Sequence, residues 1–197
     1  MLFINACVRK NSRTKRLADA VIAKRVASVS KDTTPATKSA VPVAEVRLWE
    51  QNFPVVDEAF LAKRDSLIYS GRFDDPMFDL ARQFAEAEEI VIAAPFWDLS
   101  FPAALKQYIE QINVVGVTFI YTDEGIPKGL CKAEKLTFVT TAGGGFFPEE
   151  YGFGYIKSLA ENFYGIKTVE LVSAAGLDIV GNDADEIIDA KIKEING

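Results

Sequence analysis

The sequence predicts an α/β fold in which a five-stranded parallel sheet carries helices on both faces. Three observations support this prediction. Patterns typical of strands and helices alternate from one end of the chain to the other. The run Ile90-Val91-Ile92-Ala93-Ala94 is apolar on both faces, as in a buried parallel strand. The 197 residues, 49% hydrophobic and 25% charged, suit one globular domain, expected to span residues 1–197.

The first half of the chain is expected to contain three of the strands. These strands are predicted at residues 1–7, 43–48 and 89–95, and helices at 12–29, 57–70 and 77–88. Residues 33–40, rich in Thr, Ser and Pro, indicate a loop. The turn at 74–76 opens the third helix, with Pro76 in its first turn, where a missing amide costs nothing.

The second half is expected to supply the two remaining strands of the sheet. They are predicted at residues 135–141 and 169–174, with a further β-rich segment at 117–121 and helices at 101–112, 156–163 and 183–195. Pro102 suits the first turn of its helix, and Asn182 or Asp183 suits the cap of the last one. Ligands of such sheets bind beyond the carboxyl ends of the strands. The loops after Cys7, Ala94 and Thr141 are therefore the places to search for a site.

Composition excludes several classes of function. The 22 basic and 28 acidic residues give a net charge of −6, which disfavours nucleic acid and anionic membranes as partners. No apolar run is long enough to span a bilayer, and no signal peptide is expected. The absence of histidine excludes Ser-His-Asp triads and histidine metal ligands, and no metal site is predicted. Cys7 and Cys131 are expected to be free thiols in a reducing cytoplasm.

The first loop, residues 7–14, has the chemistry of a phosphate site. Ser12 and Thr14 stand at the start of a predicted helix, where free amides and the helix dipole favour an anion. Arg9 and Arg13 can add charge-assisted hydrogen bonds to a phosphate. The alternative is that Ser12 is an ordinary helix cap and the basic residues form a solvated face.

The same loop supports a rival interpretation. Cys7, Arg13 and Thr14 fit the pattern C-x5-R-[ST], which resembles the phosphate loop of low-molecular-weight tyrosine phosphatases. That resemblance implies a Cys7 thiolate nucleophile, phosphoryl binding by Arg13, and an aspartic acid in the pair Asp75-Pro76. However, the pair lies in the middle of the chain rather than late, and no glycine follows the cysteine. The alternative for Cys7 is a buried thiol at the end of a strand.

The second loop, residues 95–102, concentrates aromatic side chains after the most buried strand. Phe96, Trp97 and Phe101 offer the flat apolar faces that bind a heteroaromatic ring. They could instead cover the edge of the core or a subunit interface. The aromatic residues after the glycine turn, from Phe146 to Tyr155, allow either a wall over a bound ring, a dimer contact or partial core burial.

The segment 95–106, PFWDLSFPAALK, resembles the P-x-Y-N-F-x-x-P-x-x-L-K segment of FMN-dependent NADH-azoreductases. Their wider relatives are the flavodoxin-like NAD(P)H:quinone oxidoreductases. The resemblance continues through residues 118–122, Gly125, 129–130 and 135–144, and Ser12-Arg13-Thr14 stands at the family's Ser-x-Ser phosphate clamp. These motifs occur in the family's order and span most of the chain.

This resemblance implies a flavodoxin-like three-layer sandwich with strand order 2-1-3-4-5 and one FMN site. The residues implied at that site are Ser12 and Thr14 at the phosphate, Pro95, Phe96, Trp97, Asp98 and Leu99 along the isoalloxazine ring, and Thr141, Ala142, Gly143 and Gly144 at its pyrimidine edge. Arg9 and Arg13 join the predicted cofactor-binding residues because of their charge in the first loop. The chain departs from the family where Asp98 replaces Asn and Ala142 replaces Arg, and it lacks the histidine that some members place near the flavin.

The resemblance also implies a function. NADH or NADPH reduces the flavin, which then reduces a quinone or azo compound by two electrons. No catalytic side chain is assigned, and Tyr121 and Tyr151 are candidates for hydrogen-bond donors to the acceptor. A homodimer is implied, because residues 119–121 lie where the family contacts the partner subunit. Two alternatives stay open: a flavin-binding electron carrier without turnover, and a cysteine phosphatase using Cys7 and Arg13.

Overall fold

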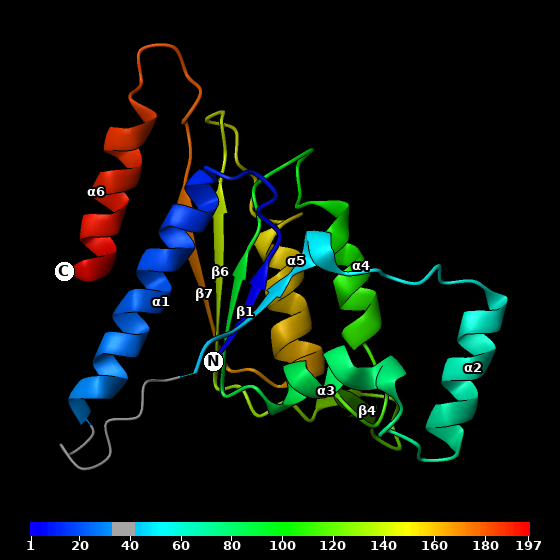
Figure 1. Cartoon of the computed structure of the whole chain (residues 1–197). Coiled ribbons are helices and arrows are strands. Elements are labelled where there is room, and N and C mark those ends of the chain that lie inside the picture. Colours follow the sequence, from blue (N-terminus) through cyan, green and yellow to red (C-terminus); the bar gives the residue numbers. More distant parts are fainter. Residues whose placement is uncertain (33–41) are drawn as a thin grey trace.

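A computed structural model describes residues 1–32 and 42–197, and its centre is a parallel five-stranded sheet (Figure 1). The strands are β1 (Leu2–Asn5), β2 (Ala44–Arg47), β3 (Glu89–Ala93), β6 (Lys135–Thr141) and β7 (Thr168–Ala174). Their order is β2-β1-β3-β6-β7, and every neighbouring pair is parallel. Counted in chain order within this sheet, that is 2-1-3-4-5, so the predicted topology is confirmed.

Helices cover both faces of the sheet. Figure 1 shows α1 (Arg13–Asp32) and α6 (Ala184–Asn196) on one face, and α3 (Asp79–Glu86), α4 (Ala103–Ile112) and α5 (Phe153–Leu159) on the other. The helix α2 (Glu58–Tyr69) stands outside these layers, and Leu67 is its one buried residue. No helix within residues 1–32 and 42–197 combines the length and apolar character that crossing a bilayer requires.

The two faces of the sheet have cores of different composition. The face under α3, α4 and α5 buries large aromatic side chains, among them Phe84, Tyr108 and Phe138. The face under α1 and α6 is packed mainly by aliphatic side chains such as Leu17 and Ile188. Residues of the central strand β3 alternate between the two cores, which explains why its sequence is apolar throughout.

Local signals place most helix ends, with some corrections. Asp183 caps α6, accepting hydrogen bonds from the amides of Asp185 and Glu186. Pro76 does lie in the first turn after its cap Asp75, but this turn is a 3₁₀ helix, η3 (Pro76–Phe78), that precedes α3. Pro102 is the N-cap of α4 rather than a residue of its first turn.

Other elements differ from their predicted limits. A further 3₁₀ turn, η2 (Leu48–Glu50), follows β2, and the helix predicted at 156–163 extends over both α5 and the π-helical turn η4 (Ala160–Tyr164). The loop predicted at 33–40 lies outside the described residues.

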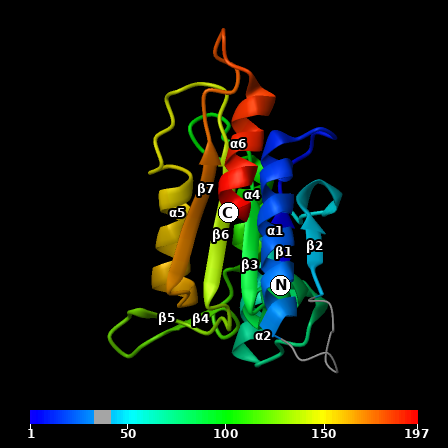
Figure 2. The same ribbon diagram turned by 90° about the vertical axis from the view of Figure 1, so that its left-hand side faces the viewer.

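A small antiparallel hairpin lies at the amino end of the parallel strands (Figure 2). Its strands are β4 (Phe119–Tyr121), within the β-rich segment, and β5 (Pro127–Gly129), which the sequence did not indicate. Gly129 packs directly on the backbone of η4, where a Cβ atom would stand 2.1 Å from the Tyr164 carbonyl carbon. The second strand therefore depends on a close backbone contact, which no propensity pattern reveals.

Candidate functional site

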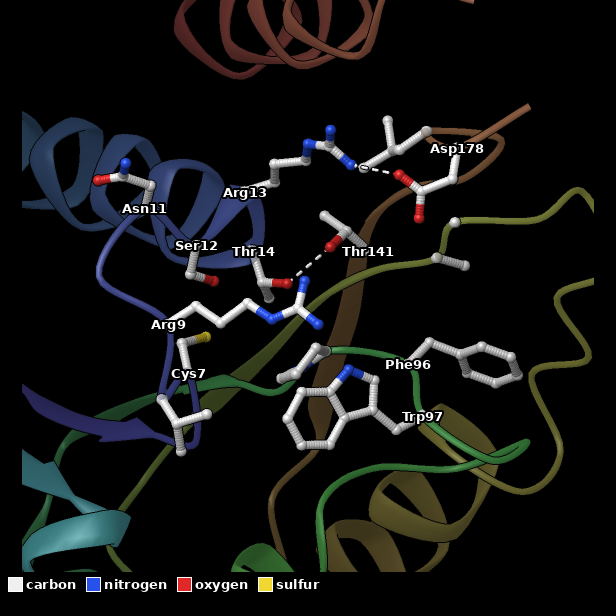
Figure 3. A pocket seen from close by; sticks show the side chains of 15 residues that line it. Cys7, Arg9, Asn11, Ser12, Arg13, Thr14, Phe96, Trp97, Thr141 and Asp178 are labelled. Carbon is white, nitrogen blue, oxygen red and sulfur yellow. Dashed lines mark hydrogen bonds and ion pairs between the residues drawn. The ribbon is translucent and has the colours of Figure 1, made fainter. Parts of the chain in front are cut away.

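A cavity of about 380 Å³ opens at the carboxyl ends of the strands (Figure 3). Four loops build it, those following β1, β3, β6 and β7, which is the position at which open parallel sheets bind ligands. The side chains and backbone around it belong to Cys7, Val8, Arg9, Asn11, Ser12, Arg13, Thr14, Pro95, Phe96, Trp97, Thr141, Ala142, Gly143, Leu177 and Asp178. The three loops singled out in the sequence thus converge on one cavity.

The first wall of the cavity is the amino end of α1. The hydroxyl of Ser12 accepts a hydrogen bond of 3.2 Å from the Lys15 amide, and the Ser12 carbonyl accepts one of 3.1 Å from the Arg16 amide. Ser12 therefore caps the helix, as one interpretation proposed. The amides of Arg13 and Thr14, in the first turn, have no acceptor within the helix. Together with the helix dipole they provide donors for an anion in the cavity.

A buried pair of hydroxyl groups joins this wall to the loop after β6. The Oγ1 atoms of Thr14 and Thr141 lie 2.7 Å apart, and the two residues are only 1% and 9% exposed. Each hydroxyl satisfies the other where water is scarce, which fixes the spacing between the two loops. Thr14 was expected near a phosphate and Thr141 near a ring, and the structure brings them into direct contact.

The two arginines of the first loop adopt different roles. In the view of Figure 3 the side chain of Arg9 runs across the cavity toward Thr14. The guanidinium of Arg13 instead forms an ion pair of 2.7 Å with Asp178, in the loop after β7. Arg9 is thus the cation that extends over the cavity, while Arg13 connects two loops at its rim.

The second wall is apolar and rises from the end of β3. Pro95, Phe96 and Trp97 line the cavity, and the Phe96 amide donates a hydrogen bond of 3.0 Å to the Thr141 carbonyl. Phe96 also makes an edge contact with Phe147, with ring centroids 4.9 Å apart. Trp97 is 37% exposed, which leaves part of the indole available at the mouth of the cavity.

Asp98 and Leu99 form the tip of a tight turn and do not line the cavity. Trp97 and Ser100 exchange backbone hydrogen bonds of 3.1 and 2.8 Å across them. Their φ angles are 51° and 68°, and a two-residue turn of type I′ requires positive φ at both positions. Asp tolerates this conformation, whereas Leu is strained in it. The turn presents Trp97 at its base and directs Asp98 and Leu99 to solvent.

The third wall is the backbone after β6. Gly143 lines the cavity beside Ala142, whereas Gly144 is exposed outside it. The carbonyls of Ala142 and Gly143 accept hydrogen bonds from Leu177 and Asp178, of 3.3 and 2.8 Å. A Cβ atom at 143 would stand 2.3 Å from Oδ2 of Asp178, so a larger residue there would displace this carboxylate.

Comparisons with known proteins agree with this architecture. The model of a family described as having a flavodoxin-like fold matches residues 1–197. The chain belongs to this flavodoxin-like family. An FMN-dependent NADH:quinone oxidoreductase of Clostridium perfringens is 41% identical over 116 residues, 58% of either chain, so the match spans less than two thirds of that relative. One of the same name from Coprothermobacter proteolyticus is 33% identical over 157 residues, 77% of either chain.

Solved structures of the family superpose on nearly the whole chain. An azoreductase of Bacillus anthracis has a TM-score of 0.79 at 26% identity and covers 99% of this chain and 95% of its own. An FMN-dependent NADH-azoreductase of the same species, solved in complex with FMN, has a TM-score of 0.76 at 22% identity, which shows the common fold. The resemblance predicted from the motifs of this sequence is therefore confirmed.

Four further residues of the cavity escaped the sequence prediction. Val8 and Asn11 belong to the first loop, but they carry neither the charge nor the hydroxyl group that predicts a phosphate contact. Leu177 and Asp178 follow β7, the fifth strand of this flavodoxin-like sheet. The signal that predicts Leu177 and Asp178 at the cavity is topological. Strand β7 is parallel to β6, so its carboxyl end lies at the same edge of the sheet as the other loops of the cavity.

The two tyrosines considered as donors lie outside the cavity. Tyr121 is on the hairpin at the opposite end of the sheet (Figure 2), so it does not serve the cavity of its own chain. Tyr151 is 62% exposed, and its carbonyl accepts a hydrogen bond of 2.7 Å from the Ser100 hydroxyl. It lines a neighbouring pocket of about 220 Å³ with Phe101, Lys106 and Tyr155.

The position of Cys7 argues against the phosphatase interpretation. Its thiol is buried at the floor of the cavity, 3.7 Å from the Ala93 carbonyl. Burial raises the pKa of the Cys7 thiol to about 11, although a hydrogen bond with Ser12 and the charge of Lys15 act in the opposite direction. Arg13 is paired with Asp178, and Asp75 caps η3. A thiol that stays protonated at neutral pH lacks the reactivity of a catalytic nucleophile.

Proposed function

We propose that residues 1–197 form a single FMN-binding domain that reduces quinones or azo compounds with electrons from NADH or NADPH. The observation that carries this proposal is one cavity that joins the amino end of a helix to an aromatic wall. A phosphate-bearing, flat cofactor matches both halves of it. The names of the relatives, which are FMN-dependent NADH:quinone oxidoreductases and azoreductases, support this assignment.

The phosphate of FMN is assigned to the first loop. The hydroxyl of Ser12 and the amides of Arg13 and Thr14 are the donors at the helix end. Arg9 supplies a positive charge across the cavity, so that a dianion meets both hydrogen bonds and a counter-ion. A cavity of this size is within the range of pockets that bury small ligands and cofactors.

The isoalloxazine ring is assigned to the space between the second and third walls. Pro95, Phe96 and Trp97 offer apolar surface, and Thr141, Ala142 and Gly143 line the opposite side of this space. The bound FMN supplies the chemistry of two-electron transfer between the nicotinamide and the acceptor. The residues of the chain bind the ring, orient it and exclude water from one side.

The tip of the turn and the outer glycine act indirectly. We assign Asp98, Leu99 and Gly144 the task of shaping the two loops, because none of the three lines the cavity. No side chain is assigned a proton transfer, consistent with a chain that contains no histidine.

A homodimer and a cytoplasmic location complete the proposal. Large apolar side chains are exposed in the loops after β3 and β6, among them Trp97, Phe146 and Tyr151, and a second copy of the chain could cover them. In a dimer, Tyr121 could reach only the cavity of the partner. The two free cysteines, Cys7 and Cys131, suit a reducing compartment.

Anaerobic reduction tests the proposed activity. FMN-loaded protein is mixed with NADH or NADPH, and its flavin absorbance is followed before and after a quinone is added. We expect the nicotinamide to bleach the band and the quinone to restore it. A bound flavin that neither nicotinamide bleaches would instead indicate an electron carrier without turnover.

A further inference from the structure

The rim of the cavity contains an ion pair between residues 165 positions apart in the sequence. Nη1 of Arg13 lies 2.7 Å from Oδ1 of Asp178. Arg13 is the first residue of α1, and Asp178 lies in the loop between β7 and α6. Both residues line the cavity, so the pair belongs to the site and not to a remote surface (Figure 3).

The position of Asp178 is set by its surroundings. Its amide donates a hydrogen bond of 2.8 Å to the Gly143 carbonyl, which anchors the backbone. Its second carboxylate oxygen, Oδ2, lies 2.3 Å from the position that a Cβ atom of residue 143 would take. The carboxylate therefore lies against the third wall, and its other oxygen pairs with Arg13.

We propose that Asp178 is a positioning residue that holds the Arg13 guanidinium at the rim and away from the phosphate. This inference rests on the proposed FMN site. In it, Arg9 is the charged ligand of the phosphate, while Arg13 contributes only its backbone amide. The pair thereby sets how strongly the site prefers a phosphorylated flavin over one without the phosphate.

The charges at this end of the cavity explain why we expect FMN to bind more tightly when the Asp178 carboxylate is removed. Arg9 and Arg13 contribute two positive charges, and Asp178 contributes one negative charge. Replacing Asp178 with asparagine removes the repulsion between its carboxylate and the phosphate, and it frees Arg13 to turn inward. Both changes strengthen the binding of the phosphate dianion, and neither acts on the isoalloxazine ring.

Binding of FMN and of riboflavin separates the phosphate from the ring. We measure both dissociation constants by flavin fluorescence for the wild type and Asp178→Asn. Because both partners are partly exposed, with side-chain exposures of 40% and 70%, we expect a modest gain. FMN should bind roughly three- to fivefold more tightly to the variant, whereas the dissociation constant of riboflavin should not change. The gain should shrink as the salt concentration rises.

A matched control lies on the same helix. Arg16 of α1 forms ion pairs with Asp185 and Asp189 of α6, and none of the three lines the cavity. Asp185→Asn therefore removes a carboxylate that is paired with an arginine of α1 but lies outside the cavity. The ratio of the FMN and riboflavin affinities should equal that of the wild type in this control.

A double-mutant cycle shows whether Arg13 carries the effect. In the Arg13→Gln background the gain from Asp178→Asn should shrink to the smaller part that comes from the lost repulsion between carboxylate and phosphate, because no guanidinium remains to be released. A gain of undiminished size in that background would reduce Asp178 to a through-space charge and overturn its positioning role. If Asp178→Asn weakens the binding of FMN and riboflavin equally, Asp178 has a purely structural role, and the proposed positioning role is overturned too.

The failure of this inference can be told from that of the proposed function. If the wild-type protein binds FMN but Asp178→Asn leaves the affinity ratio unchanged, the inference about Asp178 is wrong and the FMN site stands. If the wild-type protein binds neither flavin, the proposed function fails and the inference falls with it.

Discussion

The two principal walls of the cavity have opposite chemistry. The wall from the loop after β1 presents hydroxyls, amides and the guanidinium of Arg9, whereas the wall after β3 presents Phe96 and Trp97. A helix dipole and charges act on an anion, and aromatic surface acts on a ring, so the two contributions should be separable. Riboflavin therefore probes the aromatic wall alone, whereas FMN probes both walls.

The largest effect is expected from the charged wall. Arg9→Gln removes a charge-assisted contact, which is worth about 2 kcal/mol, so FMN binding should weaken about 30-fold. Riboflavin binding should hardly change. Lys10→Gln, the adjacent exposed cation outside the cavity, is the matched control and should bind both flavins normally. Equal losses for both flavins in Arg9→Gln would show that the walls are not separable.

A change in the aromatic wall should weaken the binding of both flavins, because both contain the ring. Trp97→Ala removes apolar surface from the ring end and should weaken FMN and riboflavin alike, by about tenfold. Trp49, 43% exposed on η2 and outside the cavity, gives the control Trp49→Ala. Fluorescence titration of the two flavins measures both variants. A loss confined to FMN would contradict the assignment of Trp97 to the ring.

The helix cap links the polar wall to stability. Ser12→Ala removes the acceptor of the Lys15 amide and should lower the free energy of unfolding by about 1 kcal/mol. Ser28→Ala, at an exposed position further along α1, should not lower it, because alanine favours a helix interior. Denaturant unfolding of the two apo proteins compares them. Equal stabilities would argue that Ser12 does not cap α1.

The smallest effect concerns the two cysteine thiols, Cys7 at the floor of the cavity and Cys131 outside it. Burial raises the pKa of the Cys7 thiol from 9.0 to about 11 and that of Cys131 to about 12. The unfolded chain therefore loses these protons first, and unfolding becomes easier as the pH rises above 9.0 toward these values. The stability of the apo protein should decline over this range, and less steeply in a Cys7→Ala, Cys131→Ala variant. An identical slope would show that the thiols do not contribute.

Much of this architecture could be predicted because its signals are local. Strand β3 is apolar on both faces, and Ser12 and Asp183 are cap residues at helix starts. Three loops could be assigned to one edge of the sheet by topology alone. The polar and aromatic walls followed from the residue types within those loops.

The remainder depends on contacts between distant segments. The partner of Arg13 lies in a loop without a motif, so nothing near Asp178 in the sequence announces it. Strand β5 pairs with β4, and its Gly129 packs on the backbone of η4, a contact between segments that are distant in the sequence. The outward direction of Asp98 and Leu99 follows from two positive φ angles, which their residue types do not favour equally.

The most direct test of the account is an absorption spectrum after reconstitution. The purified protein is incubated with FMN or, in parallel, with riboflavin, and is then desalted. We expect the flavin band to remain after FMN and to be largely lost after riboflavin, because only FMN engages both walls. Loss of the band in both samples would contradict the claim that this cavity is a flavin site.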